Sequence, residues 1–213
     1  MFDNNTIHLT VGPITTNCWI CPIGDGLAAV IDPGDEADQI ISVLKKSSLN
    51  LKYILLTHGH FDHIAAVPAL VSAFDPKPQI AIHRLDSHYL GSDAYNIHSL
   101  SIKSAMGSTA FIDALWNNLP PPDILLDEGS EIGPFTVLHL PGHTHGSAAF
   151  WDKETKRLFT GDTLFRRGYG RTDLLDGNED KIYNSLQRLF NMDPDIKVFP
   201  GHGQTTTIGQ ERR

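Results

Sequence analysis

Three histidines and an aspartate lie within seven residues, in the segment Thr57-His58-Gly59-His60-Phe61-Asp62-His63. This segment directly follows the apolar run Tyr53-Ile54-Leu55-Leu56, which is typical of a buried strand. A histidine fits a core well only when both ring nitrogens find partners, so such a cluster at a strand end is a poor packing solution. Imidazole and carboxylate groups instead suit bound zinc, iron or manganese, and the lack of thiolates argues against a closed structural zinc site.

Further candidate ligands follow other strand-like runs. The three motifs concerned are Pro141-Gly142-His143, Gly161-Asp162-Thr163 and Gly201-His202-Gly203. Their glycines allow the backbone to turn sharply beside a bound ion. We therefore expect the loops at several strand ends to converge on one metal site.

In chain order, the motifs His-Gly-His-Phe-Asp-His, Pro-Gly-His-Thr, Gly-Asp-Thr-Leu-Phe and Pro-Gly-His-Gly resemble those of the metallo-β-lactamase-fold hydrolases. Asp32-Pro33-Gly34 matches the early aspartate motif of that family. Within the family, residues 161–174 and 201–209 are similar to the short, single-domain glyoxalase II group. The resemblance spans nearly the whole chain and implies an α/β fold, an αββα sandwich, with residues 1–213 forming one domain.

The resemblance also implies a set of ligands for two divalent metal ions, with zinc as the default and iron or manganese as alternatives. One ion would be held by His58, His60 and His143, the other by Asp62, His63 and His202, and Asp162 would bridge them. Asp32 is expected to accept the second ring N–H of a metal-bound histidine and so to fix its orientation.

The resemblance favours hydrolysis of a thioester such as S-lactoylglutathione, with water activated at the metals as the nucleophile. A thiolate is a good leaving group, because a thiol pKa near about 8.5 makes protonation on departure less important than for an amine. Asp62 is predicted to orient the attacking water and accept its proton in addition to binding metal. Arg171 lies where related enzymes place a basic substrate-binding residue, so we expect it to contact a carboxylate of glutathione.

Three alternatives stay open. An iron-dependent persulfide dioxygenase is similar in the Gly-Arg-Thr-Asp segment, but that group uses one iron and has Ala-His-Asp where this chain has Gly201-His202-Gly203. A metallohydrolase acting on another ester or a lactone is the second. A non-enzymatic metal-binding domain is the least favoured, because such domains tend to lose ligands and all seven are present here.

The charge and composition of the chain limit which binding partners we expect. The formal net charge of −8 opposes nucleic-acid binding, which depends on clustered Lys and Arg. No run approaches the roughly 18 apolar residues of a membrane span, and the first residues do not resemble a signal peptide, so we expect a cytoplasmic enzyme with a small-molecule substrate.

Cys18 and Cys21 lie three apart in a strand-like run and should point to opposite faces, which predicts two reduced thiols with at least one of them buried. Oligomeric state has no signal in the sequence.

Periodicity gives the secondary structure. Strands are expected at 7–11, 16–21, 27–31, 80–82, 131–140, 148–151 and 158–160, and helices from residue 35, over 64–74 and through 182–190. Residues 85–123 are less readable; residues 111–119 have helical spacing, and the segment is either ordinary packing or a lid that shapes the substrate pocket.

His145 departs from the family, which usually has Pro there, and it could support a metal ligand, contact substrate or be exposed. His8, His83, His88, His98 and His139 are assigned no role.

Overall fold

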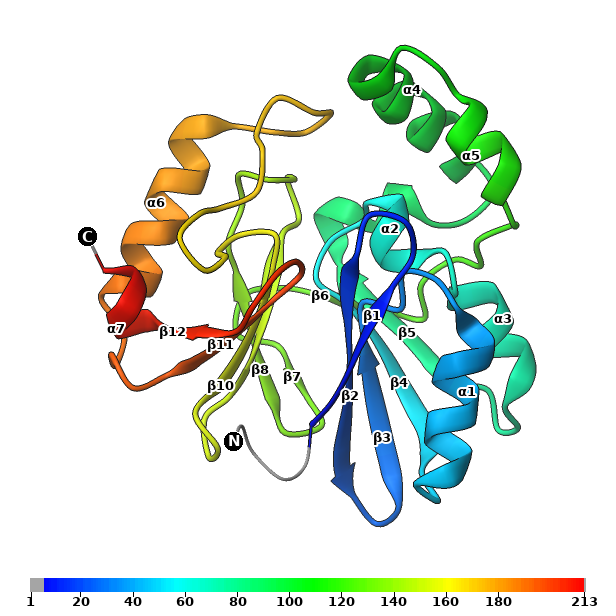
Figure 1. Cartoon of the computed structure of the whole chain (residues 1–213), viewed down its shortest axis with the longest axis horizontal. Coiled ribbons are helices and arrows are strands. Elements are labelled where there is room, and N and C mark those ends of the chain that lie inside the picture. The colour runs from blue at the N-terminus through cyan, green and yellow to red at the C-terminus, as the bar shows by residue number, and fades with distance from the viewer. Residues whose placement is uncertain (1–5, 213) are drawn as a thin grey trace.

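The computed structural model describes residues 6–212, apart from the side chains of residues 105, 106, 111, 114 and 115. Within this range two six-stranded sheets pack face to face (Figure 1). In spatial order the first sheet contains β1 (Ile7–Val11), β2 (Thr16–Gly24), β3 (Leu27–Ile31), β4 (Asn50–Leu56), β5 (Gln79–His83) and β6 (Ile124–Leu126). The second contains β12 (Thr206–Thr207), β11 (Lys197–Pro200), β10 (Arg157–Gly161), β9 (Ala148–Asp152), β8 (Phe135–His139) and β7 (Glu131–Ile132).

Helices cover the outer face of each sheet (Figure 1). On the outer face of the first sheet lie α1 (Ala37–Lys46) and α3 (Val67–Ala73). The other elements on this side of the molecule are α2 (Phe61–Ile64), the 3-10 helix η1 (Arg84–Tyr89), α4 (Ala94–Met106) and α5 (Ala110–Leu115), and of these α4 and α5 lie beyond one end of the strands (Figure 1). Beside the second sheet lie α6 (Glu179–Phe190) and α7 (Ile208–Glu211). The predicted αββα sandwich is confirmed.

Alternate side chains of β2 pack in two different hydrophobic cores, one on each face of the first sheet. Cys18 and Ile20 face the α1 and α3 side of the first sheet, whereas Trp19 and Cys21 face the second sheet and pack in the same cluster as Phe159. Cys18 and Cys21 are both free and fully buried, as predicted, and burial raises the pKa of Cys21 to about 12. These thiols are therefore protonated packing groups at neutral pH.

Parallel pairing places the candidate ligands at one end of the sandwich. Strands β3, β4, β5 and β6 run parallel in the first sheet, and β10 and β11 run parallel in the second. Parallel strands end at the same edge, so the loops after β3, β4, β10 and β11 meet there. A backbone hydrogen bond of 2.7 Å from Asn17 N–H to the Gly201 carbonyl ties the two sheets together beside these loops.

Several sequence predictions were wrong in detail, among them the helix over 64–74, which is α3 from Val67 to Ala73. The first helix begins at Ala37 rather than residue 35, because Glu36 adopts a left-handed conformation (φ 53°). The run 131–140 is not one strand; Gly133 (φ 56°) turns the chain between β7 and β8. The helix near 111 ends at Leu115, since Trp116 is extended, and α4 was not predicted. No helix among residues 6–212 has the length and apolar character of a membrane span.

Candidate metal centre

Seven predicted ligands meet at the ends of four strands and in one short helix. His58 and His60 follow β4, and Asp62 and His63 belong to α2 directly after them. The remaining three are His143 after β8, Asp162 after β10 and His202 after β11. Gly59 is required between the first two histidines, because a Cβ there would lie 2.2 Å from the ring of Tyr89.

His58, His60 and His143 form the first group. Their ligand nitrogens all lie within 4.8 Å of one another, and Nδ1 of His60 is 2.8 Å from Nε2 of His143. Nδ1 of His143 donates to the carbonyl of Arg171 at 2.7 Å, so its Nε2 keeps a lone pair facing the group. All three side chains are buried.

Asp62, His63 and His202 form the second group. Nε2 of His63 is 3.3 Å from Nε2 of His202 and 3.4 Å from Asp62 Oδ2, and His202 Nε2 is also 3.4 Å from that oxygen. Ligands at about 2.0–2.1 Å from a tetrahedral ion lie about 3.3 Å from one another, so this spacing is that of ligands around one ion.

Asp162 lies between the two groups. Its Oδ2 is 3.6 Å from His143 Nε2 in the first group and 3.5 Å from His202 Nε2 in the second. Its Oδ1 is buried without a hydrogen-bond partner among the described residues, and so are Nε2 of His58 and Nε2 of His60. Buried polar atoms are rarely left unpaired unless an ion or ligand satisfies them, so the donor set fits a binuclear metal site.

The electrostatic environment differs between the two ligand groups. Burial and neighbouring imidazoles hold the pKa of His58 and His60 well below its usual value, so both rings are neutral and available as ligands. Burial opposes charge on His63 too, but Asp62, Asp162 and Asp32 raise its pKa to about 10. Burial also disfavours ionisation of Asp62, yet His63 and His202 hold the pKa of this carboxyl well below its usual range. The second group therefore attracts positive charge.

Asp32 orients histidines from both groups. Its Oδ2 accepts from Nδ1 of His63 at 3.0 Å and from the Thr57 hydroxyl at 2.7 Å. Because that hydroxyl hydrogen is committed to Asp32, the Thr57 oxygen accepts from Nδ1 of His58, 3.0 Å away. Both histidines are left with Nε2 turned toward the site. The contact with His63 is the one expected from the sequence, and the link to His58 through Thr57 was not foreseen.

Asp86 was missed by sequence reasoning. It is fully buried in η1, and its carboxylate accepts from Gly59 N–H (3.0 Å), the Thr144 hydroxyl (2.7 Å) and Gly146 N–H (2.5 Å). Gly59 separates His58 from His60, and Thr144 follows His143. One side chain thus fastens together the two loops that carry the first group. An isolated acid outside any motif gave no signal of this role.

A pocket of about 320 Å³ opens onto the centre. Beside five of the candidate ligands it is lined by Ile14, Phe61, His98, Ser101, Ile102, Phe165, Gly170, Arg171 and Leu174. Arg171 is half exposed and pairs with Asp173 through two contacts of 2.7 Å. Three of the lining residues belong to α4, in the segment 85–123 for which a pocket-forming role was one prediction. His98, assigned no role from the sequence, is one of them.

His145 lies outside this pocket. Its side chain is half exposed, and Nδ1 is 3.4 Å from Asp176, which also pairs with His88 at 2.9 Å. Asp176 belongs to the loop that carries Arg171. Of the three roles left open for His145, exposure with an ion pair to that loop describes its position.

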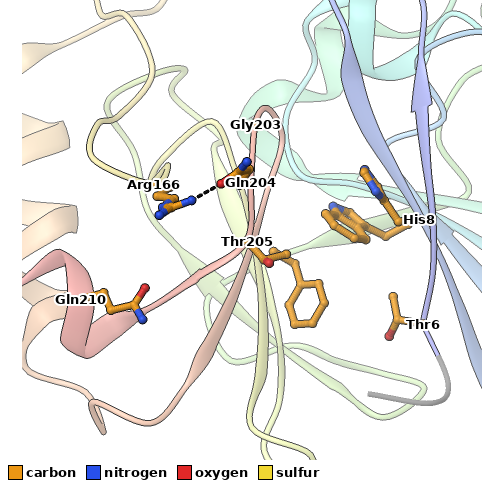
Figure 2. A pocket seen from close by; sticks show the side chains of 9 residues that line it. Thr6, His8, Arg166, Gly203, Gln204, Thr205 and Gln210 are labelled. Atoms are coloured by element: carbon orange, nitrogen blue, oxygen red, sulfur yellow. Dashed lines mark hydrogen bonds between the residues drawn. The ribbon is translucent and has the colours of Figure 1, made fainter. Parts of the chain in front are cut away.

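A second, larger hollow of about 650 Å³ lies beside the centre, between β1 and the segment after His202 (Figure 2). Figure 2 shows Thr6 and His8 on one side and Arg166, hydrogen-bonded to Gln204, on the other. His8 stacks on Trp19 with ring centroids 4.3 Å apart. None of the seven candidate ligands lines this hollow, so we place it outside the metal centre.

The sandwich and its centre match a known class. The metallo-β-lactamase superfamily profile covers residues 11–202, and the chain belongs to that superfamily. Membership of this superfamily, together with the groups of histidine and aspartate described above, supports a metal-dependent hydrolase.

Three proteins of this superfamily are similar to the chain over nearly its whole length. The chain is 36% identical to hydroxyacylglutathione hydrolase GloC of Haemophilus influenzae, over 97% of this chain and 96% of the relative. A crystal structure of TTHA1623 in a di-iron-bound form matches with a TM-score of 0.82 at 38% identity, covering 97% of each chain. A crystal structure of BLEG-1 B3 metallo-β-lactamase matches with a TM-score of 0.84 at 34% identity, covering 97% of this chain and 95% of that one. The chain is therefore a metallo-hydrolase superfamily member whose relatives differ in activity.

Proposed function

We propose that this protein is a binuclear metal-dependent thioesterase that hydrolyses S-lactoylglutathione or a related thioester. The observation that carries the proposal is the complete second group, Asp62, His63 and His202, joined to the first by Asp162. An enzyme with one iron does not need this group, so its presence favours hydrolysis over the dioxygenase. The similarity to hydroxyacylglutathione hydrolase GloC supports the choice of substrate.

The proposed ligands are the seven side chains described above, with zinc as the default and iron or manganese as alternatives. Bound ions would supply Lewis-acid polarisation of a carbonyl and lower the pKa of water toward neutrality. The protein's own contribution is to hold the ligands in place through Asp32 and Asp86 and to keep the site largely enclosed. The di-iron form of one relative supports keeping iron as an alternative to zinc.

Asp62 also has a proposed role toward water. Its carboxylate accepts from the Thr16 hydroxyl at 3.1 Å, which fixes its orientation at the pocket floor. Because the pKa of Asp62 lies well below its usual range, this group is a better ligand and hydrogen-bond acceptor than a base. We propose that orienting the attacking water is the larger part of its role and that accepting the proton is the smaller.

The pocket suits an ester with a good leaving group. Its walls beyond the ligands are mainly apolar, and the neutral His98 is no ready proton donor, because burial lowers its pKa to about 4. A thiolate leaves without prior protonation more easily than an amine. Arg171, at the pocket edge, would pair with a carboxylate of the thiol carrier. The cytoplasmic location, and the lack of nucleic-acid or membrane partners, stay predictions from the sequence.

The direct test is hydrolysis of S-D-lactoylglutathione by protein whose bound metals are counted in the same preparation. We expect turnover with about two metals per chain, and loss of both in Asp162→Ala. Asp195→Ala, which removes an exposed acid, serves as the matched control and should keep both. Two metals without turnover would refute the substrate, and a single iron would favour the dioxygenase.

A further inference from the structure

Helix α4 places two polar side chains in the wall of the catalytic pocket. His98, Ser101 and Ile102 have helical spacing, so they share one face of α4, and all three line the pocket that holds His60, His143 and Asp162. His98 is 1% exposed and Ser101 is 4% exposed. Buried polar groups normally have a hydrogen-bond partner, so the contacts of each side chain indicate what it can bind.

His98 presents only an acceptor to the pocket. Its Nε2 lies 2.9 Å from the carbonyl of Tyr89, and a carbonyl can only accept, so Nε2 carries the hydrogen. The neutral ring then has a bare lone pair on Nδ1. Phe61, Tyr89 and Trp116 surround the ring at centroid distances of 5.4 to 5.8 Å and hold it in place. Burial lowers the pKa of His98 to about 4, so this acceptor persists at neutral pH.

Ser101 adds a hydroxyl one turn further along the helix. Its oxygen forms no hydrogen bond with another described residue, although the side chain is buried. Its pocket neighbours beyond the ligands include the apolar Ile14, Phe165 and Leu174. The Ser101 oxygen is not fully enclosed by protein, so it opens onto the pocket, where a bound molecule can reach it. His98 and Ser101 together therefore offer one acceptor and one donor to a small polar group.

We propose that His98 and Ser101 bind a hydroxyl on the acyl part of the substrate, which makes this enzyme selective for hydroxyacyl thioesters. A hydroxyl both donates and accepts, so it complements this pair. The inference rests on the proposed thioesterase function and deepens it by assigning the residues that choose the acyl group.

The orientation of the substrate follows from the two sides of the pocket. Arg171 and Leu174 come from the loop before α6, which approaches the centre from the side of the second sheet, whereas α4 lies beyond the strand ends on the side of the first sheet (Figure 1). With the reacting carbonyl at the metal ligands between them, an anionic thiol carrier extends toward Arg171. The acyl group then extends toward α4.

Two substrates that differ only by the hydroxyl provide the test. S-D-lactoylglutathione and S-propionylglutathione share the thiol carrier and carbon chain, so the ratio of their kcat/KM values isolates recognition of the hydroxyl. Ser101→Ala and His98→Phe should each lower this ratio by about three- to ten-fold relative to wild type, the effect of one lost hydrogen bond. Bound metal should be unchanged in both variants.

Ser99→Ala is the matched control, because Ser99 has a buried hydroxyl on α4 but does not line the pocket. Its ratio should equal that of wild type. An unchanged ratio in Ser101→Ala, with metals retained and both thioesters still hydrolysed, would overturn the inference while leaving the thioesterase standing. The small Ser101→Ala change keeps the test valid if His98→Phe does not fold. If wild type hydrolyses neither thioester, the proposed function fails and this inference fails with it.

Discussion

Thr144 donates its hydroxyl hydrogen to the carboxylate of Asp86 across 2.7 Å, although the two residues are 58 positions apart in the chain. Asp86 also accepts from the backbone of Gly59 and Gly146, so it holds both loops of the first ligand group. We predict that Asp86→Ala lowers metal affinity by about ten- to a hundred-fold, the usual effect of removing a group that orients ligands. Metal retained after dialysis against a chelator series measures this.

Two variants sharpen the Asp86 prediction. Asp86→Asn keeps the shape but places an amide against N–H and O–H donors, so its metal affinity should fall nearly as far. Asp152→Asn alters another buried acid, one paired with Arg157 at 2.6 Å away from the centre, and should cost stability while retaining metal. Equal metal loss in Asp152→Asn and Asp86→Asn would mean that general destabilisation, and not loop positioning, explains the effect.

Gly201 lies against Asp162, the aspartate between the two ligand groups. A Cβ at this position would lie 2.2 Å from Asp162 Oδ1 and 2.7 Å from His63 Cε1, so Gly201→Ala must displace ligands. A displacement of about 1 Å can reduce turnover by about a hundred-fold, and we expect such a loss together with reduced metal content. Gly168→Ala, where a Cβ would meet nothing within 4 Å, should leave turnover and metal unaltered. Full activity in Gly201→Ala would contradict the Asp162 assignment.

Arg171 gives a prediction about substrate affinity. Its side chain lines the pocket but is paired with Asp173, and both are half exposed or more. Arg171→Ala should raise KM for a glutathione thioester by about ten-fold, with kcat nearly constant. This is the low end of the effect of losing a charged hydrogen bond, because the Arg171 side chain is half exposed. Added salt should raise the KM of wild type and change that of the variant little.

Substitutions of two other charged residues test whether net charge alone explains the change in KM. Asp173→Asn frees the Arg171 guanidinium and should lower KM about two-fold, consistent with a weak exposed ion pair. Arg166→Ala removes a positive charge that lines the second hollow instead, and its KM should match wild type. A rise of KM in Arg166→Ala as large as in Arg171→Ala would show that net charge, and not a specific contact, draws the substrate.

The ligand groups were predictable from sequence because their motifs are local and their order is specific. His58, His60, Asp62 and His63 lie in one heptad, and the other three ligands each follow a strand that is marked by an apolar run. The fold could be predicted for a related reason, since strand and helix periodicities alternate twice. The αββα sandwich follows from covering each sheet on both faces.

Helix α4 and Asp86 could not be predicted in this way. The pocket-facing side of α4 carries His98 and Ser101, which are polar, so its helical pattern is weak even though the helix is buried there. Asp86 acts only because η1 approaches two distant loops, and single-sequence spacing contains no record of that approach. Both failures occur where tertiary contacts, not periodicity, determine what a residue does.

Burial of His98 also predicts a pH dependence of stability. Its pKa is about 4 in the folded protein, whereas an unfolded histidine has a pKa near about 6.5. Between these values the unfolded chain binds more protons, so stability is full above about pH 6.5 and is lost as pH falls toward 4. His98 should account for about 2 kcal/mol of the loss between pH 7.5 and 5. The measurement is the free energy of unfolding in urea at both pH values and at equal metal concentration. Its change between the two pH values should be smaller in His98→Gln than in wild type by the His98 contribution. An equal change in the variant and in wild type would refute the prediction.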